Sequence, residues 1–234
     1  MVAGIFRNMG ELLLPTVPED TVPMPVSGLP LAGEIMMILF ILLALALMGN
    51  FMSIIPHLAD SILRARGSTA LEGSVRVSRD RNLIALVFLI PAVLIMYRYN
   101  LYYPDFVKEM QPNARLLATM GVFLGYLLLR YLLFAWFKPR RNDAYTMSYR
   151  AGYSFFILMS LVAFFTLGVL SLFNASDPTV RGFILVEVIL FYAVYFFRRG
   201  QILSTSCSPF TTFLYLCALE LLPTGAFVVS AVIL

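Results

Sequence analysis

The chain has 234 residues, of which 60% are hydrophobic and 13% are charged, and its formal net charge is +4. An ordinary soluble domain is about half apolar and a quarter charged, so its interior is too small to bury this much apolar surface. The composition therefore excludes a soluble fold and predicts a polytopic, all-α membrane protein. Its basic residues are explained by membrane topology, so we expect the lipid bilayer as a partner and no nucleic acid.

Residues 1–34 are predicted to form an extended arm ahead of the membrane domain. The stretch PTVPEDTVPMPVSGLP is proline-rich, acidic and poor in helix-forming residues. The arm lacks the basic start, apolar core and small-residue cleavage site of a signal peptide. It is either a passive leader or a strap against a partner or the outer surface of the bundle. Residues 35–234 form the membrane domain.

Six apolar stretches have about the 20-residue length that a membrane-spanning helix needs, or approach it. They are residues 35–55, 83–103, 116–137, 152–173, 182–197 and 210–231. The fifth is short, but Pro178 suits the first turn of a helix and would lengthen it at its start. The prediction is a bundle of six transmembrane helices, which puts both termini on one side.

The basic residues predict which side that is, because cytoplasmic connections are enriched in Lys and Arg. The connections on the side of the termini hold Arg7, Arg98, Lys108, Arg115 and Arg181. The opposite connections hold more, namely Arg64, Arg66, Arg76, Arg79, Arg81, Lys138, Arg140, Arg141, Arg150, Arg198 and Arg199. Both termini are therefore expected outside the cytoplasm.

Three charged residues remain inside the predicted spans: Arg130, Glu187 and Glu220. Such residues are costly in lipid, and they face the interior of a bundle and find partners. At about 1.5 Å per residue, Glu220 lies about 15 Å from Phe210 and Glu187 about 16 Å from Arg198, which predicts one level for both carboxylates. Arg130 lies about 10 Å from its helix end by the same count, within reach of Glu220 or of the inner interface.

Several polar or helix-breaking residues complete the predicted cluster. Pro223, three residues after Glu220, is expected to free the carbonyl of Leu219 from its helical hydrogen bond. Pro91 and the Gly49–Asn50 pair are expected to add breaks in the second and first spans, and Asn50 is a possible fourth polar member. The cluster is either a structural clasp between helices or a proton- or cation-responsive site.

Several kinds of chemistry are disfavoured by the residues present. His57 is the single histidine and lies at a membrane edge, and no serine stands in a G-x-S-x-G context, which argues against an intramembrane serine protease. No HExxH or clustered Cys/His pattern predicts a metal, and no Walker or Rossmann glycine pattern predicts a nucleotide. We expect no enzyme activity, no cofactor and no metal.

The closing stretch FLYLCALELLP, with Tyr215, Leu216, Cys217, Glu220 and Pro223, carries a resemblance to a known family. Together with the outer arm and about six spans, it resembles an uncharacterised multi-pass inner-membrane protein family of Bacteroidota. The resemblance implies the inner membrane of a two-membrane cell, with both termini periplasmic, and makes Glu220 the signature acid of the family. It implies no activity.

Two functional hypotheses follow from these observations. The first is a non-enzymatic component of an envelope membrane assembly, whose Glu220 cluster fixes the helices and whose partners are other membrane proteins or further copies of the chain. The second is a small proton- or cation-coupled transporter or channel that uses Glu187 and Glu220. A third, lipid or polyprenyl handling, has no residue pattern in its favour. The absence of paired broken helices favours the first hypothesis.

Overall fold

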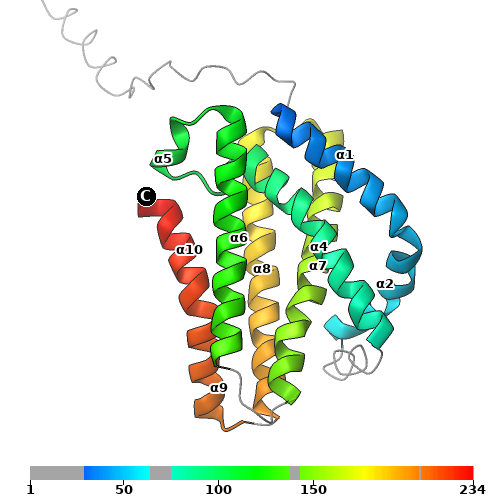
Figure 1. Cartoon of the computed structure of the whole chain (residues 1–234), viewed down its shortest axis with the longest axis vertical. Coiled ribbons are helices and arrows are strands. Elements are labelled where there is room, and N and C mark those ends of the chain that lie inside the picture. The colour runs from blue at the N-terminus through cyan, green and yellow to red at the C-terminus, as the bar shows by residue number, and fades with distance from the viewer. Residues whose placement is uncertain (1–28, 64–74, 138–142, 206, 234) are drawn as a thin grey trace, which may run out of the picture.

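The computed structural model describes residues 29–63, 75–137, 143–205 and 207–233, and its regular structure there is helical, as predicted (Figure 1). The first predicted span corresponds to two helices, α1 (Leu31–Ala46) and α2 (Met48–Leu63). Helix α1 begins at Leu31, four residues before the predicted start of the first span at residue 35. Most of the predicted outer arm lies outside the described residues.

The remaining helices follow the predicted order. They are α4 (Val75–Arg98), α5 (Asp105–Lys108), α6 (Pro112–Trp136), α7 (Asp143–Leu172), α8 (Asp177–Ser204), α9 (Pro209–Leu216), the π-helical turn η1 (Cys217–Leu221) and α10 (Leu222–Ile233). Helix α8 begins with Asp177 and has Pro178 in its first turn, as expected from the ring's fixed φ angle.

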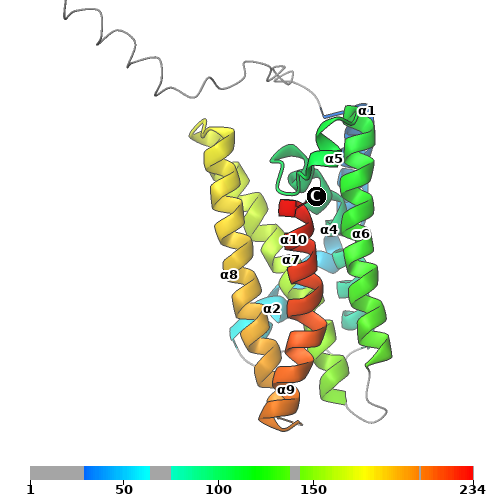
Figure 2. The same cartoon turned by 90° about the vertical axis from the view of Figure 1, so that its left-hand side faces the viewer.

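Five stretches in the described helices are long and apolar enough to cross a membrane, and the bent pair α1–α2 raises the number to six if it counts as one span. The two helices of this pair meet at an angle of 68° around Leu47. The bend lies next to Gly49, where the sequence predicts a break, and glycine weakens a helix because it costs backbone entropy. The start of α1 and the end of α10 lie at the same end of the bundle (Figures 1 and 2).

Helix α4 is the central helix of the described bundle. It packs against α1, α2, α6 and α7, and 56% of its most apolar window is buried, against 11–28% in the other four long spans. It crosses α7 obliquely (Figure 1). Pro91 lies inside α4 and is buried, and the helix continues through it. The predicted break at Pro91 is therefore wrong, because neighbouring helices hold the segment and tolerate one missing hydrogen bond.

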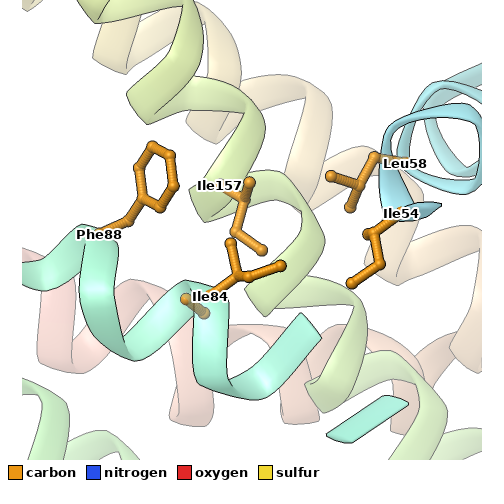
Figure 3. Close-up of a cluster of buried hydrophobic side chains, with 6 residues drawn as sticks. Ile54, Leu58, Ile84, Phe88 and Ile157 are labelled. Carbon is orange, nitrogen blue, oxygen red and sulfur yellow. The ribbon is translucent and has the colours of Figure 1, made fainter. Parts of the chain in front are cut away.

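A hydrophobic cluster joins α2, α4 and α7. Ile54 and Leu58 of α2 point toward Ile84 and Phe88 of α4 and Ile157 of α7 (Figure 3). Each of these side chains is at most 9% exposed. Elsewhere many large apolar side chains of the helices are exposed, as expected for surfaces that face lipid.

The helices also divide into two neighbouring sets on the other side of α4. Helix α8 packs against α7 and α9, whereas α10 packs against α6 and η1. Helices α8 and α10 diverge above the level of α9 (Figure 2). Buried side chains join these sets: a hydrophobic cluster contains Phe134, Tyr145, Leu203, Leu216 and Leu219, and charged residues of the membrane region add further contacts.

Candidate functional site

The helix that carries Glu220 changes its winding at that residue. The backbone N–H of Leu222 bonds to the carbonyl of Cys217, five residues earlier, and the turn Cys217–Leu221 is π-helical. Pro223 follows directly, and since proline lacks an N–H and clashes with the carbonyl four residues before it, a widened turn relieves that clash. The predicted break at Pro223 thus takes the form of a π-turn within a continuous span.

The π-turn also leaves a backbone carbonyl available to another helix. The carbonyl of Glu220 accepts a hydrogen bond of 3.2 Å from the hydroxyl of Tyr192 on α8. The same hydroxyl lies 3.2 Å from Oγ1 of Thr224, and Thr224 also contacts the hydroxyl of Tyr126 on α6 at 3.1 Å. The sequence suggested a freed carbonyl at Leu219, whereas the carbonyl that receives the side-chain hydrogen bond is that of Glu220.

The structure brings Arg130 and Glu220 together. Arg130 projects from α6, and its Nη2 lies 2.6 Å from Oε1 of Glu220. The Glu220 side chain is completely buried, while that of Arg130 is 19% exposed. Depth counting allowed the Arg130 side chain to reach either Glu220 or the inner interface, and the structure shows the contact with Glu220. The pair joins α6 to the closing span.

A second arginine, Arg199, contacts the same carboxylate oxygen through Nη1. Its side chain is only 2% exposed, and its Nε donates a hydrogen bond of 2.9 Å to Ser148 on α7. The sequence predicts Arg199 in a cytoplasmic connection because the fifth apolar stretch ends at Phe197. The placement in a connection is wrong, since α8 continues to Ser204 and contains Arg199.

Tyr195 lies between these charges. Its hydroxyl donates to Oε1 of Glu220 at 2.8 Å and accepts from Arg130 at 2.5 Å and from Arg199 at 3.0 Å. Tyr195 and Arg199 are four residues apart on α8, so they share one face of the helix. This four-residue spacing is visible in the sequence. It could have identified Tyr195 and Arg199 as site residues if the predicted helix had continued past Phe197. Gly152 of α7 faces the Tyr195 ring, and an added Cβ would lie 3.4 Å from its hydroxyl.

We define the Glu220 cluster as Arg130, Ser148, Tyr195, Arg199 and Glu220. It holds two guanidinium groups and one carboxylate, a net charge of +1 from these three groups. Its members come from α6, α7, α8 and η1, so it connects the set that contains α7 and α8 to the set that contains α6 and α10. Buried charges of this kind hold helices in one arrangement only while all partners are present.

The structure does not bring Glu187 to this cluster. Glu220 contacts Tyr195 and Arg199, which lie eight and twelve residues after Glu187 on α8. At about 1.5 Å per residue, this places Glu187 about 12 to 18 Å away along the helix. The predicted common level is wrong because the count for Glu187 began at Arg198, six residues before the true end of α8.

Asn50 also lies apart from the cluster. It belongs to α2, which packs against α4, α7 and α1 on the side of the bundle away from α10 (Figure 1). Its backbone carbonyl accepts a hydrogen bond of 2.7 Å from Ser53. Asn50 is therefore not a fourth polar member of the site, because the bend at Leu47 directs α2 toward α4 and α7.

The comparisons with known proteins return no match for this chain: neither a family model, nor a curated protein, nor a solved structure resembles it significantly. The resemblance to an uncharacterised Bacteroidota family thus stays a prediction. Within the described residues, no group of three or more His, Cys, Asp or Glu side chains is placed to hold a metal ion.

The Tyr195 hydroxyl gives the first testable prediction. We expect Tyr195→Phe to lower the free energy of unfolding by about 1–3 kcal/mol, because it removes one donor to Glu220 and one acceptor for two buried arginines. Thermal unfolding of the purified protein in detergent measures this. Tyr131→Phe is the matched control, since Tyr131 is 53% exposed on α6 and its loss of a hydroxyl is expected to change little. Equal effects of the two changes would contradict the role given to Tyr195.

Proposed function

We propose that this chain is a non-enzymatic integral membrane protein that forms part of a membrane assembly, and that the Glu220 cluster holds its helices in one arrangement. The observation that carries the proposal is the enclosure of Glu220 by two guanidinium groups and the Tyr195 hydroxyl. A carboxylate beside two positive charges is a poor site for a metal cation or a transported proton, because the two arginines repel a third positive charge. The cluster suits a clasp better than a relay.

The exposed surface supports a role among membrane partners. The long helices expose large apolar side chains, for example Leu128 on α6 and Ile189 on α8. Outside the spans, the connections in the described ranges contain only one short helix, the four-residue α5. This leaves little described surface for a soluble partner, and it favours other membrane proteins or further copies of the chain.

The proposed location is the inner membrane of a two-membrane cell, with both termini in the periplasm. The bias of Lys and Arg toward one set of connections supports this orientation. The resemblance of the closing stretch to a Bacteroidota inner-membrane family supports the choice of membrane. Fusions of a reporter that fluoresces only in the cytoplasm to the C-terminus test the orientation, and a bright fusion would contradict it.

The transporter hypothesis is less favoured by the geometry. It rests on Glu187 and Glu220 acting as a pair, and these residues lie at different levels of the bundle. A direct test reconstitutes the chain and its Glu220→Gln variant in proteoliposomes and records proton flux against pH. A flux that the unchanged chain supports, and that Glu220→Gln abolishes at normal folded yield, would overturn the proposed function.

The assembly itself is tested in the native membrane. The tagged chain is extracted in a mild detergent, and the mass of the particle is compared with the 26.3 kDa of the single chain. We expect a particle of fixed stoichiometry that contains further membrane proteins or further copies. A single-chain particle, found also after cross-linking in the membrane before extraction, would contradict the proposal.

A further inference from the structure

Glu187 is a carboxyl group near the middle of a membrane-spanning helix. It lies ten residues after Asp177, where α8 begins. At about 1.5 Å per residue this is about 15 Å from the start of a helix that is longer than the hydrocarbon core of about 30 Å, so Glu187 lies within the membrane-spanning part of α8. An ionisable group at this depth is rare, costly and a functional site by default.

The surroundings of Glu187 satisfy it only in part. Its side chain is half-buried at the seam of α8 and α7, where Thr166 of α7 hydrogen-bonds to it. Its Oε1 is buried and has no hydrogen-bond partner among the described residues. A buried acceptor without a partner costs free energy, and the cost is larger in lipid than in water.

The helix surface beside Glu187 is apolar and exposed. Phe183, Val186 and Leu190 are 54%, 57% and 60% exposed. These positions lie within one turn of Glu187, so they border it on the side that faces away from the bundle. Another helix that packs on this surface would cover these apolar side chains at the depth of the half-buried Glu187 side chain.

The cations of α8 do not supply the missing partner. Arg181 is six residues nearer the outer end and exposed. Arg198 is eleven residues away and donates to Gln201, and Arg199 is twelve residues away and held by Glu220 and Ser148. A second copy in the same orientation places its own Glu187 at this depth, opposite a like group. Its exposed arginines, such as Arg79, Arg98 and Arg150, belong to the ends of helices. Charge complementarity therefore requires a different chain.

We infer that Glu187 is the docking point for a transmembrane helix of another membrane protein, and that this helix presents a lysine or arginine at the depth of Glu187 in the membrane. The inference rests on the proposed function, since it names the kind of partner that the assembly contains. The basic side chain would bind the carboxyl group, while its helix covers Phe183, Val186 and Leu190. A charge pair of this kind fixes both the partner and its depth in the membrane.

The test uses a model helix of known chemistry. The full chain, labelled with a donor fluorophore, is reconstituted in liposomes with an acceptor-labelled leucine-rich transmembrane peptide of about 20 residues that carries one central lysine. Energy transfer is measured as peptide is added. We expect the apparent affinity to be roughly five- to tenfold higher than for the same peptide with leucine at the centre, the size of one interhelical polar contact in a membrane.

Two variants connect the binding to Glu187. Glu187→Leu is expected to remove the preference for lysine, whereas Glu187→Asp keeps a carboxyl group and is expected to retain most of it. Leu190→Val, on the same exposed surface, is the control and should leave the preference unchanged. Equal affinity of the unchanged chain for both peptides, or a preference that survives Glu187→Leu, would overturn the inference. The two proposals can fail separately. A native particle that is a single chain would contradict the proposed function, whereas the peptide assay tests only the role of Glu187.

Discussion

Glu220→Leu is expected to be the most destabilising single change in the membrane region. It leaves Arg130 and Arg199 close together without their shared anion, so the local charge rises from +1 to +2. Removing one partner of a buried ion pair costs about 3–5 kcal/mol in free energy of unfolding. The measurement is the thermal unfolding midpoint and the folded yield in detergent.

The control for this change keeps the shape of the side chain. Glu220→Gln retains an acceptor for the Tyr195 hydroxyl and for one arginine, so we expect it to lose less stability than Glu220→Leu. A second control, Leu222→Ala, removes an apolar side chain that is 61% exposed in the same span and is expected to change little. A Glu220→Leu protein as stable as the Leu222→Ala control would contradict the clasp.

Arg199→Leu is expected to restore part of the stability that Glu220→Leu removes. The single change leaves two cations, and the double change leaves only Arg130, whose side chain is 19% exposed and long enough to extend toward an interface. A coupling free energy of about 1–3 kcal/mol is expected from the double-mutant cycle. The four proteins are compared by unfolding in the same detergent.

Substituting Arg130 and substituting Arg199 are expected to restore different amounts of the stability that Glu220→Leu removes. Arg130→Leu in the Glu220→Leu background leaves Arg199, whose side chain is only 2% exposed, against 19% for Arg130. We therefore expect a smaller recovery with Arg130→Leu than with Arg199→Leu. The opposite order would mean that Arg130, and not Arg199, is the more costly charge to leave alone, and would contradict the burial argument.

The apolar runs of the sequence predicted the helices well because length and hydropathy are local properties. The spans at residues 116–137 and 152–173 correspond to α6 and α7. The errors lie at helix ends and bends. Helix α8 continues through Arg198 and Arg199 to Ser204. Arg199 has partners inside the bundle and Arg198 bonds to Gln201 of the same helix, and no hydropathy count could show that.

The candidate site was predicted only in part, because hydropathy identifies charges within apolar runs but does not show which residues meet in the fold. Arg130 and Glu220 stand out as charges within apolar runs, so the sequence identifies both. Tyr195 looks like any aromatic residue of a span, and Arg199 lies where hydropathy suggests a loop. Glu187 stands out equally, but its distance from Glu220 depends on where α8 ends. Depth counting fails whenever the end of a helix is misplaced.

The sequence by itself determined that the chain is a helical membrane protein and that Glu220, Arg130 and Glu187 are its unusual charges. Hydrophobicity decides the first point, and the cost of a charge in lipid decides the second. Only the tertiary structure decided which charges meet. The π-turn before Pro223, the length of α8 and the positions of α6 and α7 around it bring two arginines to Glu220 and leave Glu187 at the seam of α7 and α8. Such contacts depend on the relative placement of several helices, which no single segment encodes.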